Sequence, residues 1–314
     1  MLNYNGAVYA VNEQNIDGIG RILPDGCVLT VGSFDGVHLG HRALLNELKK
    51  ASGREGVPAV AVTFAPGDRP KSAPAIAQPE KVFRLLRDCG ADLIVTVPFA
   101  MLRGMTASEF AERFIVDTFS AKRFVCGYDF RFGFGRKGDA STLKELLGPH
   151  GIGITVCEPV IRGGAPVSST RIRALITEGD IASANELLES PFSFKGKVIK
   201  GDHIAASLGY PTANLAFPPE LCVPAYGVYA AEFAFSGEKC RAMLNFGVKP
   251  TFGPAEAPLC EVNLFGFSGD IYGVEAEVSF LAFIRPEERF ATPARLAERI
   301  AADRAAVERF FDER

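Results

Sequence analysis

Two of the chain's four histidines stand three residues apart in the stretch SFDGVHLGH, residues 33–41. His38 and His41 follow an apolar strand-like segment, open a helix-like one, and have Gly36 and Gly40 beside them. A helix N-terminus offers free N–H groups to a phosphate, and glycine allows a close backbone approach. Residues i and i+3 share a helix face, so both imidazoles are expected to reach one transferring phosphoryl group and stabilise its charge. A pair of surface histidines beside a tight turn is the alternative.

A second segment that could bind phosphate is VSSTRIRALI, residues 167–176. It places the hydroxyls of Ser168, Ser169 and Thr170 just before a helix that carries Arg171 and Arg173. Hydroxyls at this position cap a helix and can also bind phosphate, and an arginine fork matches phosphate oxygens. A plain helix cap with solvated arginines explains the segment equally well.

A third segment, GYDFRFGFGRKGD, spans residues 127–139. It combines Arg131, Arg136 and Lys137 with glycines and three phenylalanines. Cationic and aromatic side chains together suit an anionic ligand that has a flat aromatic part. The alternative is a mobile basic loop.

Strand-like and helix-like segments alternate through the first half of the chain, which predicts a mostly parallel sheet with helices on both faces. Buried strands are expected where apolar, β-branched residues run together, and helices where apolar residues recur at i, i+3 and i+4. The expected strands are residues 27–32, 58–64, 92–99, 123–130 and 153–160, and the expected helices are residues 41–52, 79–90, 106–119 and 141–151.

The pattern changes after about residue 190, where glycine-punctuated strand-like pieces follow one another. They predict an antiparallel barrel or sandwich. A last helix is expected to start with Thr292 as its N-cap and Pro293 as its first residue, and to pack on the barrel. We therefore expect a Rossmann-like α/β domain over residues 1–190 and a β-barrel domain with a C-terminal helix over residues 191–314.

Composition narrows the classes of function. A chain of 314 residues with 47% hydrophobic residues can form two cores, and its net charge of −3 argues against non-specific nucleic-acid binding. The seven cysteines form no CxxC pair, so neither zinc nor redox chemistry is indicated. The start of the chain lacks a signal-peptide pattern, and no apolar run approaches the ~20 residues of a membrane span. We expect a cytoplasmic protein that binds neither nucleic acid nor membranes.

The three phosphate-site segments, taken in order, resemble the adenylyltransferase half of bacterial bifunctional riboflavin kinase/FMN adenylyltransferases. In the second half, GKVIKGDHIAASLGYPTANL, PAYGVYAA, LNFGVKPTFG and CEVNLFGFSGDIYG resemble the riboflavin kinase domain. The resemblance runs from about residue 15 to the C-terminus. It implies a nucleotidyltransferase domain and an enzyme that phosphorylates riboflavin with ATP to FMN. The same enzyme would then adenylylate FMN with a second ATP, giving FAD and pyrophosphate.

The resemblance also implies roles for single residues. His38, His41 and Arg173 would act in adenylyl transfer, and Glu261 would take the proton of the riboflavin 5′-hydroxyl. Thr212 and Asn214, in the PTAN motif, would bind Mg²⁺ and the phosphates of ATP. The residues expected to contact nucleotide or flavin are Gly32, Phe34, Gly36, Gly40, Asp129, Arg131, Phe132, Ser168, Ser169, Thr170, Gly209, Pro211, Thr212 and Asn214.

Several positions depart from the motifs of the family that the chain resembles. In the first half, the family's usual Phe-Asp-Pro-His-Pro is replaced by TFAPGDRP. In the second half, the usual Gly-Arg before the Leu-Gly-Phe-Pro segment is replaced by two alanines. The usual Glu-Val-His-Leu-Leu-Asp-Phe is replaced by EVNLFGF. These departures leave two alternatives open: an enzyme that retains one of the two activities, or a degenerate flavin- or nucleotide-binding regulatory protein. The departing residues are Ala65, Gly67, Ala205, Ala206, Asn263 and Gly266.

Overall fold

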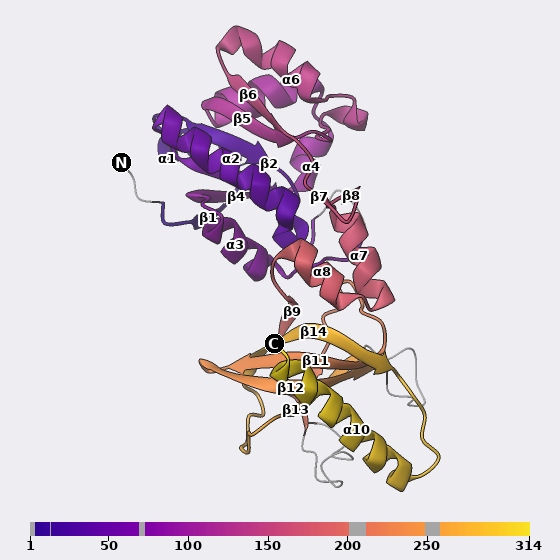
Figure 1. Cartoon of the computed structure of the whole chain (residues 1–314). Helices are drawn as coiled ribbons and strands as arrows, with labels where there is room; N and C mark the ends of the chain where they lie inside the picture. The colour runs from indigo at the N-terminus through magenta and orange to yellow at the C-terminus, as the bar shows by residue number, and fades with distance from the viewer. Residues whose placement is uncertain (1–3, 13, 69–72, 201–211, 249–257) are drawn as a thin grey trace. The chain divides into compact units, whose positions relative to one another are not determined.

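The structure is a computed structural model that describes residues 4–12, 14–68, 73–200, 212–248 and 258–314 (Figure 1). Its internal contacts divide the chain into two units. Unit 1 comprises Met1–Ala73 and Pro79–Ser168, and unit 2 comprises Pro74–Gln78 and Ser169–Arg314. Packing thus separates the two units at residues 168/169, and the domain boundary predicted at 190/191 stays a prediction.

Unit 1 contains a six-stranded sheet in which every pairing is parallel. Every residue of the β2 and β4 strands is buried, because helices cover both faces of the sheet. In sheet order the strands are β1 (Ala7–Ala10), β4 (Leu93–Val97), β3 (Ala59–Phe64), β2 (Cys27–Val31), β5 (Ala121–Gly127) and β6 (Gly153–Cys157).

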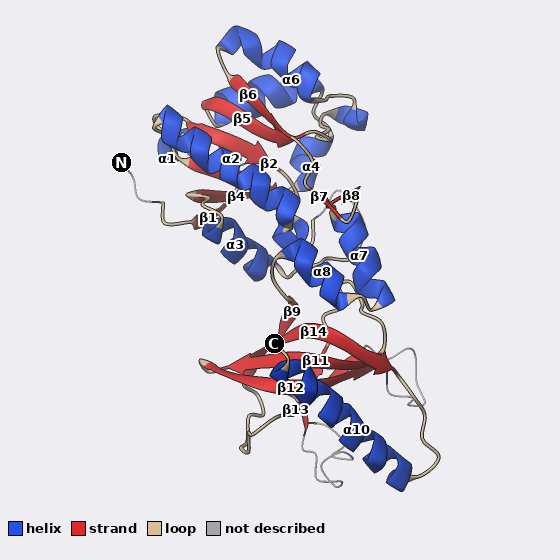
Figure 2. Cartoon of the chain, viewed as in Figure 1, coloured by secondary structure: helices blue, strands red, loops and turns tan. Residues whose placement is uncertain are grey.

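Helices follow the strands of unit 1 as the sequence predicts, with additional short turns (Figure 2). One face of the sheet packs against α1, η3 and α6 in a single apolar cluster, while α2 contacts β2, β3 and β5 with other buried residues. The helix expected over residues 106–119 begins with a Thr106–Glu109 capping box and continues as a π-helix. The elements are η1 (Ile16–Gly18), α1 (Ile19–Ile22), η2 (Asp35–Val37), α2 (Leu39–Glu55), α3 (Pro79–Asp88), α4 (Phe99–Arg103), α5 (Ala107–Glu109), η3 (Phe110–Thr118), η4 (Phe134–Arg136), α6 (Ala140–Leu147) and η5 (Gly148–His150), with a hairpin of β7 (Ile161–Arg162) and β8 (Ala165–Pro166).

Unit 2 contains an antiparallel six-stranded sheet whose ends meet. Beyond β9, Ile199 pairs with Asn214 of β10, and the Ile199 N–H donates to the Asn214 carbonyl over 2.8 Å. This bridge joins the two edge strands, so the sheet curls into the predicted barrel. In sheet order the strands are β10 (Thr212–Ala216), β13 (Leu259–Leu264), β12 (Glu238–Gly247), β11 (Gly227–Phe235), β14 (Glu275–Pro286) and β9 (Phe192–Lys197).

The helices among the described residues of unit 2 are α7 (Ser169–Glu178), α8 (Ile181–Leu188) and α10 (Pro293–Asp312). The Thr292 side chain caps α10 as expected, by accepting a hydrogen bond from the N–H of Arg295. Val307 and Phe311 of this helix are buried where it packs on the barrel. The barrel interior is largely aromatic, with Tyr229 and five phenylalanines in edge and tilted contacts. The predicted fold class is confirmed in both halves.

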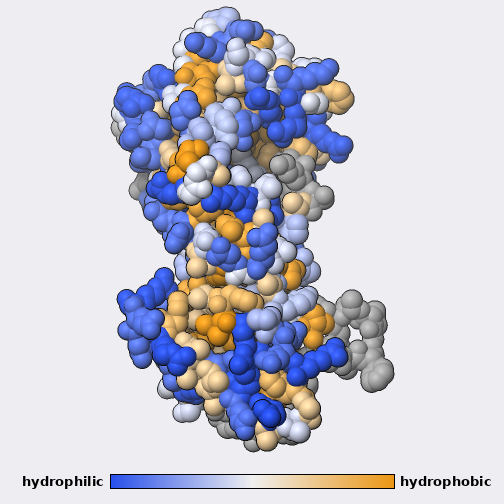
Figure 3. Space-filling view, turned by 45° about the vertical axis from the view of Figure 1, so that its right-hand side comes forward, coloured by the Kyte–Doolittle hydropathy of each residue, from blue (hydrophilic) through white to orange (hydrophobic). Residues whose placement is uncertain are grey.

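On the face drawn in Figure 3, hydrophilic residues surround small hydrophobic areas. Among the residues that the structure describes, none of the helices combines the length and apolar character that a bilayer crossing requires.

Candidate functional site

The histidine turn lies at the point where the strand order of unit 1 reverses. From β2 the chain proceeds to β3 and β4 on one side, while β5 and β6 lie on the other. Ligands of open parallel sheets bind at this point, beyond the carboxyl ends of the strands. The turn with His38 and His41 follows β2, and the loop of residues 128–139 follows the adjacent β5. The topology therefore brings two of the predicted segments to the same edge of the sheet.

The two imidazoles stack on each other. Their ring centroids are 3.7 Å apart with an interplanar angle of 14°. The α2 helix begins at Leu39, and His38 is its N-cap, with Nδ1 accepting from the backbone N–H of His41 over 3.3 Å. His38 therefore caps the helix with an extended backbone instead of lying within it, while its ring still lies against that of His41.

The His38 side chain is buried and that of His41 is half-buried. His38 is 6% exposed, and Phe34 places its ring edge-on against His41 at 5.3 Å. Burial and the neighbouring His38 lower the pKa of His41 well below its ordinary value of 6.5, so His41 is neutral at physiological pH. Among the described residues, none hydrogen-bonds to the buried Nδ1 atom of His41. A buried polar atom of this kind costs about 1–3 kcal/mol unless a ligand or water satisfies it.

The backbone before the histidines holds three residues with positive φ: Phe34 at 46°, Gly36 at 77° and Val37 at 44°. Glycine suits this region, but a β-branched residue is strained there, at a cost of about 1–3 kcal/mol. The Arg42 side chain holds the strained turn, because its Nε donates to the Val37 carbonyl over 3.2 Å. Such strain is concentrated at active sites.

Gly40 is required by the position of the His38 ring. A Cβ atom at Gly40 would lie 3.1 Å from Cε1 and 3.2 Å from Nδ1 of His38. The same position is 3.6 Å from the Val167 carbonyl, so the residue preceding Ser168 lies beside the start of α2. At Gly32, a Cβ would meet the Phe34 ring at 3.2 Å. These two glycines therefore make room for rings of the site.

The loop after β5 presents a different aromatic residue from the expected one. Phe132 is buried in the core, 5.0 Å from Phe110 between ring centroids, whereas Phe134 is 66% exposed. Asp129 and Arg131 are exposed on the same loop. Sequence reasoning missed the difference because the three phenylalanines alternate with glycine and arginine in a stretch that forms no regular strand.

Of the other predicted phosphate-binding residues, Ser168 is half-buried and belongs to unit 1, whereas Ser169, Thr170 and Arg173 belong to unit 2. Ser169 is the first residue of α7, so Ser169 and Thr170 lie in its first turn rather than before it. Ser169 is half-buried and Thr170 is exposed. Arg173 is half-buried, and its Nε donates to the Pro74 carbonyl over 2.7 Å.

In the barrel, polar residues line one face of three adjacent strands. Asn214 of β10 and Asn245 of β12 are both register partners of Glu261 on β13, and Thr212 is the partner of Asn263. Register partners share a sheet face, and the alternate residues of these strands form the apolar barrel interior. The structure thus brings Thr212, Asn214 and Glu261 together. Gly209 and Pro211, together with Ala205 and Ala206, lie outside the described residues.

Asn214 is built to receive a ligand. The residue is 4% exposed, and its buried Oδ1 accepts no hydrogen bond from the described part of the chain. Beside it stand the hydroxyl of Thr212 and, across the strand pair, the carboxylate of Glu261. Oxygen donors of this kind are those that Mg²⁺ prefers. The residues present therefore fit the metal that the sequence predicts.

Backbone conformation explains why glycine stands at two of the positions that depart from the family motifs. Ala65–Asp68 is a turn in which the Asp68 N–H donates to the Ala65 carbonyl over 2.9 Å, and Gly67 has φ +80°. Pro66 before a positive-φ glycine is typical of a type II turn. Gly266 follows β13 with φ +71°. Both glycines thus occupy positions where other residues are strained.

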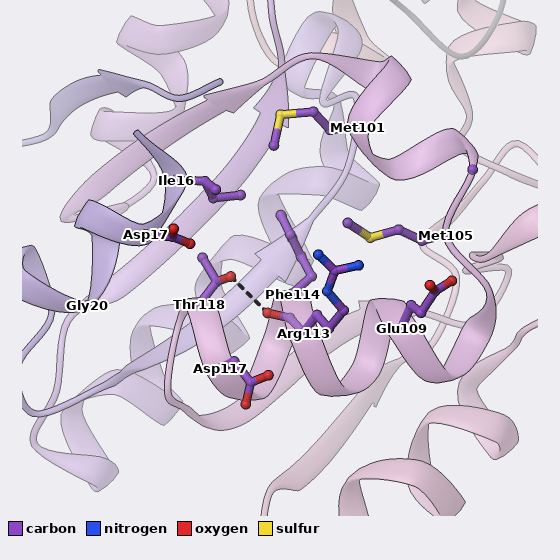
Figure 4. A pocket seen from close by; sticks show the side chains of 11 residues that line it. Ile16, Asp17, Gly20, Met101, Met105, Glu109, Arg113, Phe114, Asp117 and Thr118 are labelled. Atoms are coloured by element: carbon purple, nitrogen blue, oxygen red, sulfur yellow. Dashed lines mark hydrogen bonds between the residues drawn. The ribbon is translucent and has the colours of Figure 1, made fainter. Parts of the chain in front are cut away.

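A pocket of about 760 Å³ lies elsewhere in unit 1 (Figure 4). None of the residues assigned a role from the sequence lines it. Its walls combine two thioethers, an arginine and three carboxylates, and the Thr118 hydroxyl donates to the Arg113 carbonyl over 2.8 Å. The lining residues are Ile16, Asp17, Gly20, Met101, Gly104, Met105, Glu109, Arg113, Phe114, Asp117 and Thr118.

Comparisons with known proteins agree with the resemblance. A family model described as FAD synthetase matches residues 21–171, and one described as riboflavin kinase matches residues 188–311. The chain is 34% identical over 305 residues to a bifunctional riboflavin kinase/FMN adenylyltransferase of Escherichia coli (strain K12), covering 95% of this chain and 97% of the relative. A relative of the same description from Pseudomonas fluorescens is 36% identical over 302 residues, covering 94% and 96%.

Among solved structures, the crystal structure of a protein described as a macrolide-efflux protein from Streptococcus pneumoniae is similar, with a TM-score of 0.85 and 30% identity over 96% of this chain and 98% of that one. Two family models and relatives above 30% identity thus cover nearly the whole chain. The chain belongs to the family of bifunctional riboflavin kinase/FMN adenylyltransferases.

Proposed function

We propose that this chain performs both reactions of its family with two separate sets of residues, FMN adenylylation over residues 1–190 and riboflavin phosphorylation over residues 191–314. Both family models match, and ATP is the co-substrate of both reactions. One observation carries the assignment of residues in both halves. A buried polar atom without a hydrogen-bond partner among the described residues stands where each motif predicts a ligand: Nδ1 of His41 and Oδ1 of Asn214. A cytoplasmic location stays a prediction.

In the adenylyl transfer, a phosphate oxygen of FMN forms a bond to the α-phosphorus of ATP, and the bond to the bridging oxygen of pyrophosphate breaks. His38 and His41 stabilise the charge on the α-phosphate through hydrogen bonds, because the pair is preorganised by stacking and capping. The backbone of Gly36 and Gly40 allows a close approach. Ser168 binds the triphosphate, and the loop with Asp129 and Arg131 borders the flavin nucleotide. The triphosphate-binding roles that the resemblance implies for Ser169, Thr170 and Arg173, which belong to unit 2, stay predictions.

Replacing His41 with Ala tests the first assignment. Loss of one preorganised donor lowers the rate by about 10²-fold or more, so FAD formation from FMN and ATP is expected to fall by this factor. FMN formation from riboflavin should persist, because it uses the barrel. His150→Ala, at an exposed histidine of unit 1, is the matched control and should change neither rate. FAD formation at the parental rate in His41→Ala would refute the assignment.

In the phosphorylation, the riboflavin 5′-hydroxyl oxygen forms a bond to the γ-phosphorus of ATP as the bond to ADP breaks. Glu261 accepts the hydroxyl proton, because the hydroxyl is a poor nucleophile until its proton has an acceptor. Thr212 and Asn214 hold Mg²⁺ and the ATP phosphates. When bound, Mg²⁺ neutralises the charge of the triphosphate and so lowers the barrier to in-line attack.

Glu261→Gln keeps the size of the side chain and removes the proton acceptor. We expect this variant to lose riboflavin phosphorylation and still convert supplied FMN to FAD, as measured by chromatographic separation of both flavins. Glu238→Gln, at the exposed start of β12, is the matched control. Undiminished phosphorylation in Glu261→Gln would remove Glu261 from the mechanism. When the parent enzyme is incubated with riboflavin, ATP and Mg²⁺, formation of FMN without FAD would favour the alternative with a single activity. Formation of neither FMN nor FAD would favour the alternative of a regulatory protein.

A further inference from the structure

A row of three polar side chains crosses the barrel at the proposed kinase base. Asn214, Glu261 and Asn245 are successive register partners on β10, β13 and β12, so their side chains leave the sheet on the same face. Asn214 carries the proposed ligand oxygen on one side of the carboxylate. Asn245 stands on the other side, and its Nδ2 lies 3.5 Å from Oε2 of Glu261 as a hydrogen-bond donor.

We propose that Asn245 is a positioning residue for riboflavin phosphorylation, which orients the Glu261 carboxylate toward the substrate hydroxyl. The inference rests on the proposed role of Glu261 and assigns a role to a residue of the segment LNFGVKPTFG for which none was predicted. The amide donates to Oε2 of the carboxylate that accepts the proton of the 5′-hydroxyl. Asn245 keeps its own protons throughout, and only the orientation of the carboxylate depends on it.

The placement of Asn245 explains why an amide suits this position. Both Asn245 and Glu261 are half-buried, where a hydrogen bond to a carboxylate is stronger than in water. The donor–acceptor distance of 3.5 Å is long, as is common for catalytic hydrogen bonds before substrate binds. An aspartate in place of the amide would face the Glu261 carboxylate with a second negative charge, and a leucine would offer no donor.

The test compares Asn245→Leu and Asn245→Asp with the parent enzyme. A misoriented base costs about 10-fold in rate, so kcat of riboflavin phosphorylation should fall about 10-fold in Asn245→Leu and further in Asn245→Asp. The KM values for riboflavin and ATP should stay within about 2-fold of the parental values, because no substrate contact is removed. Adenylylation of supplied FMN should not change in either variant.

Asn185→Leu is the matched control for a merely structural amide in the same unit. Its Nδ2 donates to the Phe280 carbonyl over 2.8 Å, and its Oδ1 accepts from the Phe192 N–H over 2.6 Å. This substitution should lower the free energy of unfolding without lowering kcat. A kcat loss in Asn245→Leu that merely matches that of Asn185→Leu would assign Asn245 a structural role and overturn the proposal.

A double-mutant cycle separates the inference from the proposed function. In the Glu261→Gln background, Asn245→Leu should cause no further loss, since the carboxylate that it orients is gone. A parental phosphorylation rate in Glu261→Gln alone would refute the proposed base. A large loss in Glu261→Gln with a parental kcat in Asn245→Leu would refute only the positioning role. The positioning role would also be overturned if Asn245→Leu lowered kcat by the same factor in the Glu261→Gln background as in the parent.

Discussion

Replacing Gly40 with alanine should separate the stability of α2 from the geometry of the histidine stack. The new Cβ would lie 3.1 Å from Cε1 of His38, tighter than an ordinary contact, so the ring must move by a few tenths of an ångström. A misplacement of ~1 Å can cost ~10²-fold in rate, so this smaller shift should cost roughly 5- to 10-fold. Alanine instead of glycine within a helix adds about 0.5–1 kcal/mol of stability.

The assay follows FAD formation from FMN and ATP beside urea unfolding of the same variant. Gly40→Ala should show a lower rate of FAD formation, an unchanged rate of riboflavin phosphorylation, and an unfolding free energy no lower than that of the parent. Activity and stability therefore move independently in one variant, which general misfolding cannot produce.

Gly53→Ala in the same helix is the matched control. Nothing lies within 4 Å of a Cβ at Gly53, so it should bring a similar gain in stability without loss of FAD formation. Parental FAD formation by a well-folded Gly40→Ala would refute the catalytic importance of the stack. Equal losses in both variants would instead assign the effect to stiffening of α2.

Two further predictions concern titration and a buried ion pair. Because the pKa of His41 is lowered on folding, the unfolded chain binds this proton more readily, and stability should fall as pH drops below about 6.5 until the folded-state pKa is passed. His41→Gln should weaken this dependence in denaturant unfolding measured between about pH 5 and 7.5, and an identical profile would contradict it. Asp303 pairs with Arg285 over 2.6 Å, with the side chains 6% and 12% exposed. Asp303→Ala leaves the buried guanidinium without this partner and should cost about 3–5 kcal/mol in urea unfolding, and a loss below ~1 kcal/mol would contradict this account.

Periodicity was sufficient to predict the elements that carry strong apolar patterns. The buried strands of unit 1 and the long strands of the barrel lie where such patterns stand, because burial on both faces demands continuous apolar residues. The β1 strand was not predicted because Ala7–Ala10 is an edge strand with three exposed residues, so its sequence carries little apolar pattern. The π-helix was also missed, since apolar spacing is nearly the same in α- and π-helical turns.

Site residues were predictable in type but only partly in geometry. The Gly-x-His-x-Gly-His spacing located both histidines, yet the capping role of His38 depends on a backbone angle that spacing does not encode. Asn245 lies in the quoted segment LNFGVKPTFG, but no role was predicted for it because it is one polar residue in an apolar strand. A usable signal existed: polar residues recur at alternate positions, at Thr212 and Asn214 in one strand and at Glu261 and Asn263 in another. Only the register of three strands that are distant in sequence shows that Asn245 extends the same row.

The departure at Gly67 leads to a prediction that runs against simple restoration of the family motif. Gly67 has φ +80° and nothing within 4 Å of a Cβ, so backbone conformation rather than space excludes larger residues there. A histidine, the family's usual residue, would pay about 1–2 kcal/mol for the left-handed backbone. Gly67→His should therefore lower the free energy of unfolding by about 1 kcal/mol without raising FAD formation. Gly104→His, at φ −87° with equally open space, should cost little in stability. A Gly67→His variant of parental stability that forms FAD faster would refute this prediction, because it would show that the turn tolerates the side chain and that a histidine at position 67 contacts a ligand.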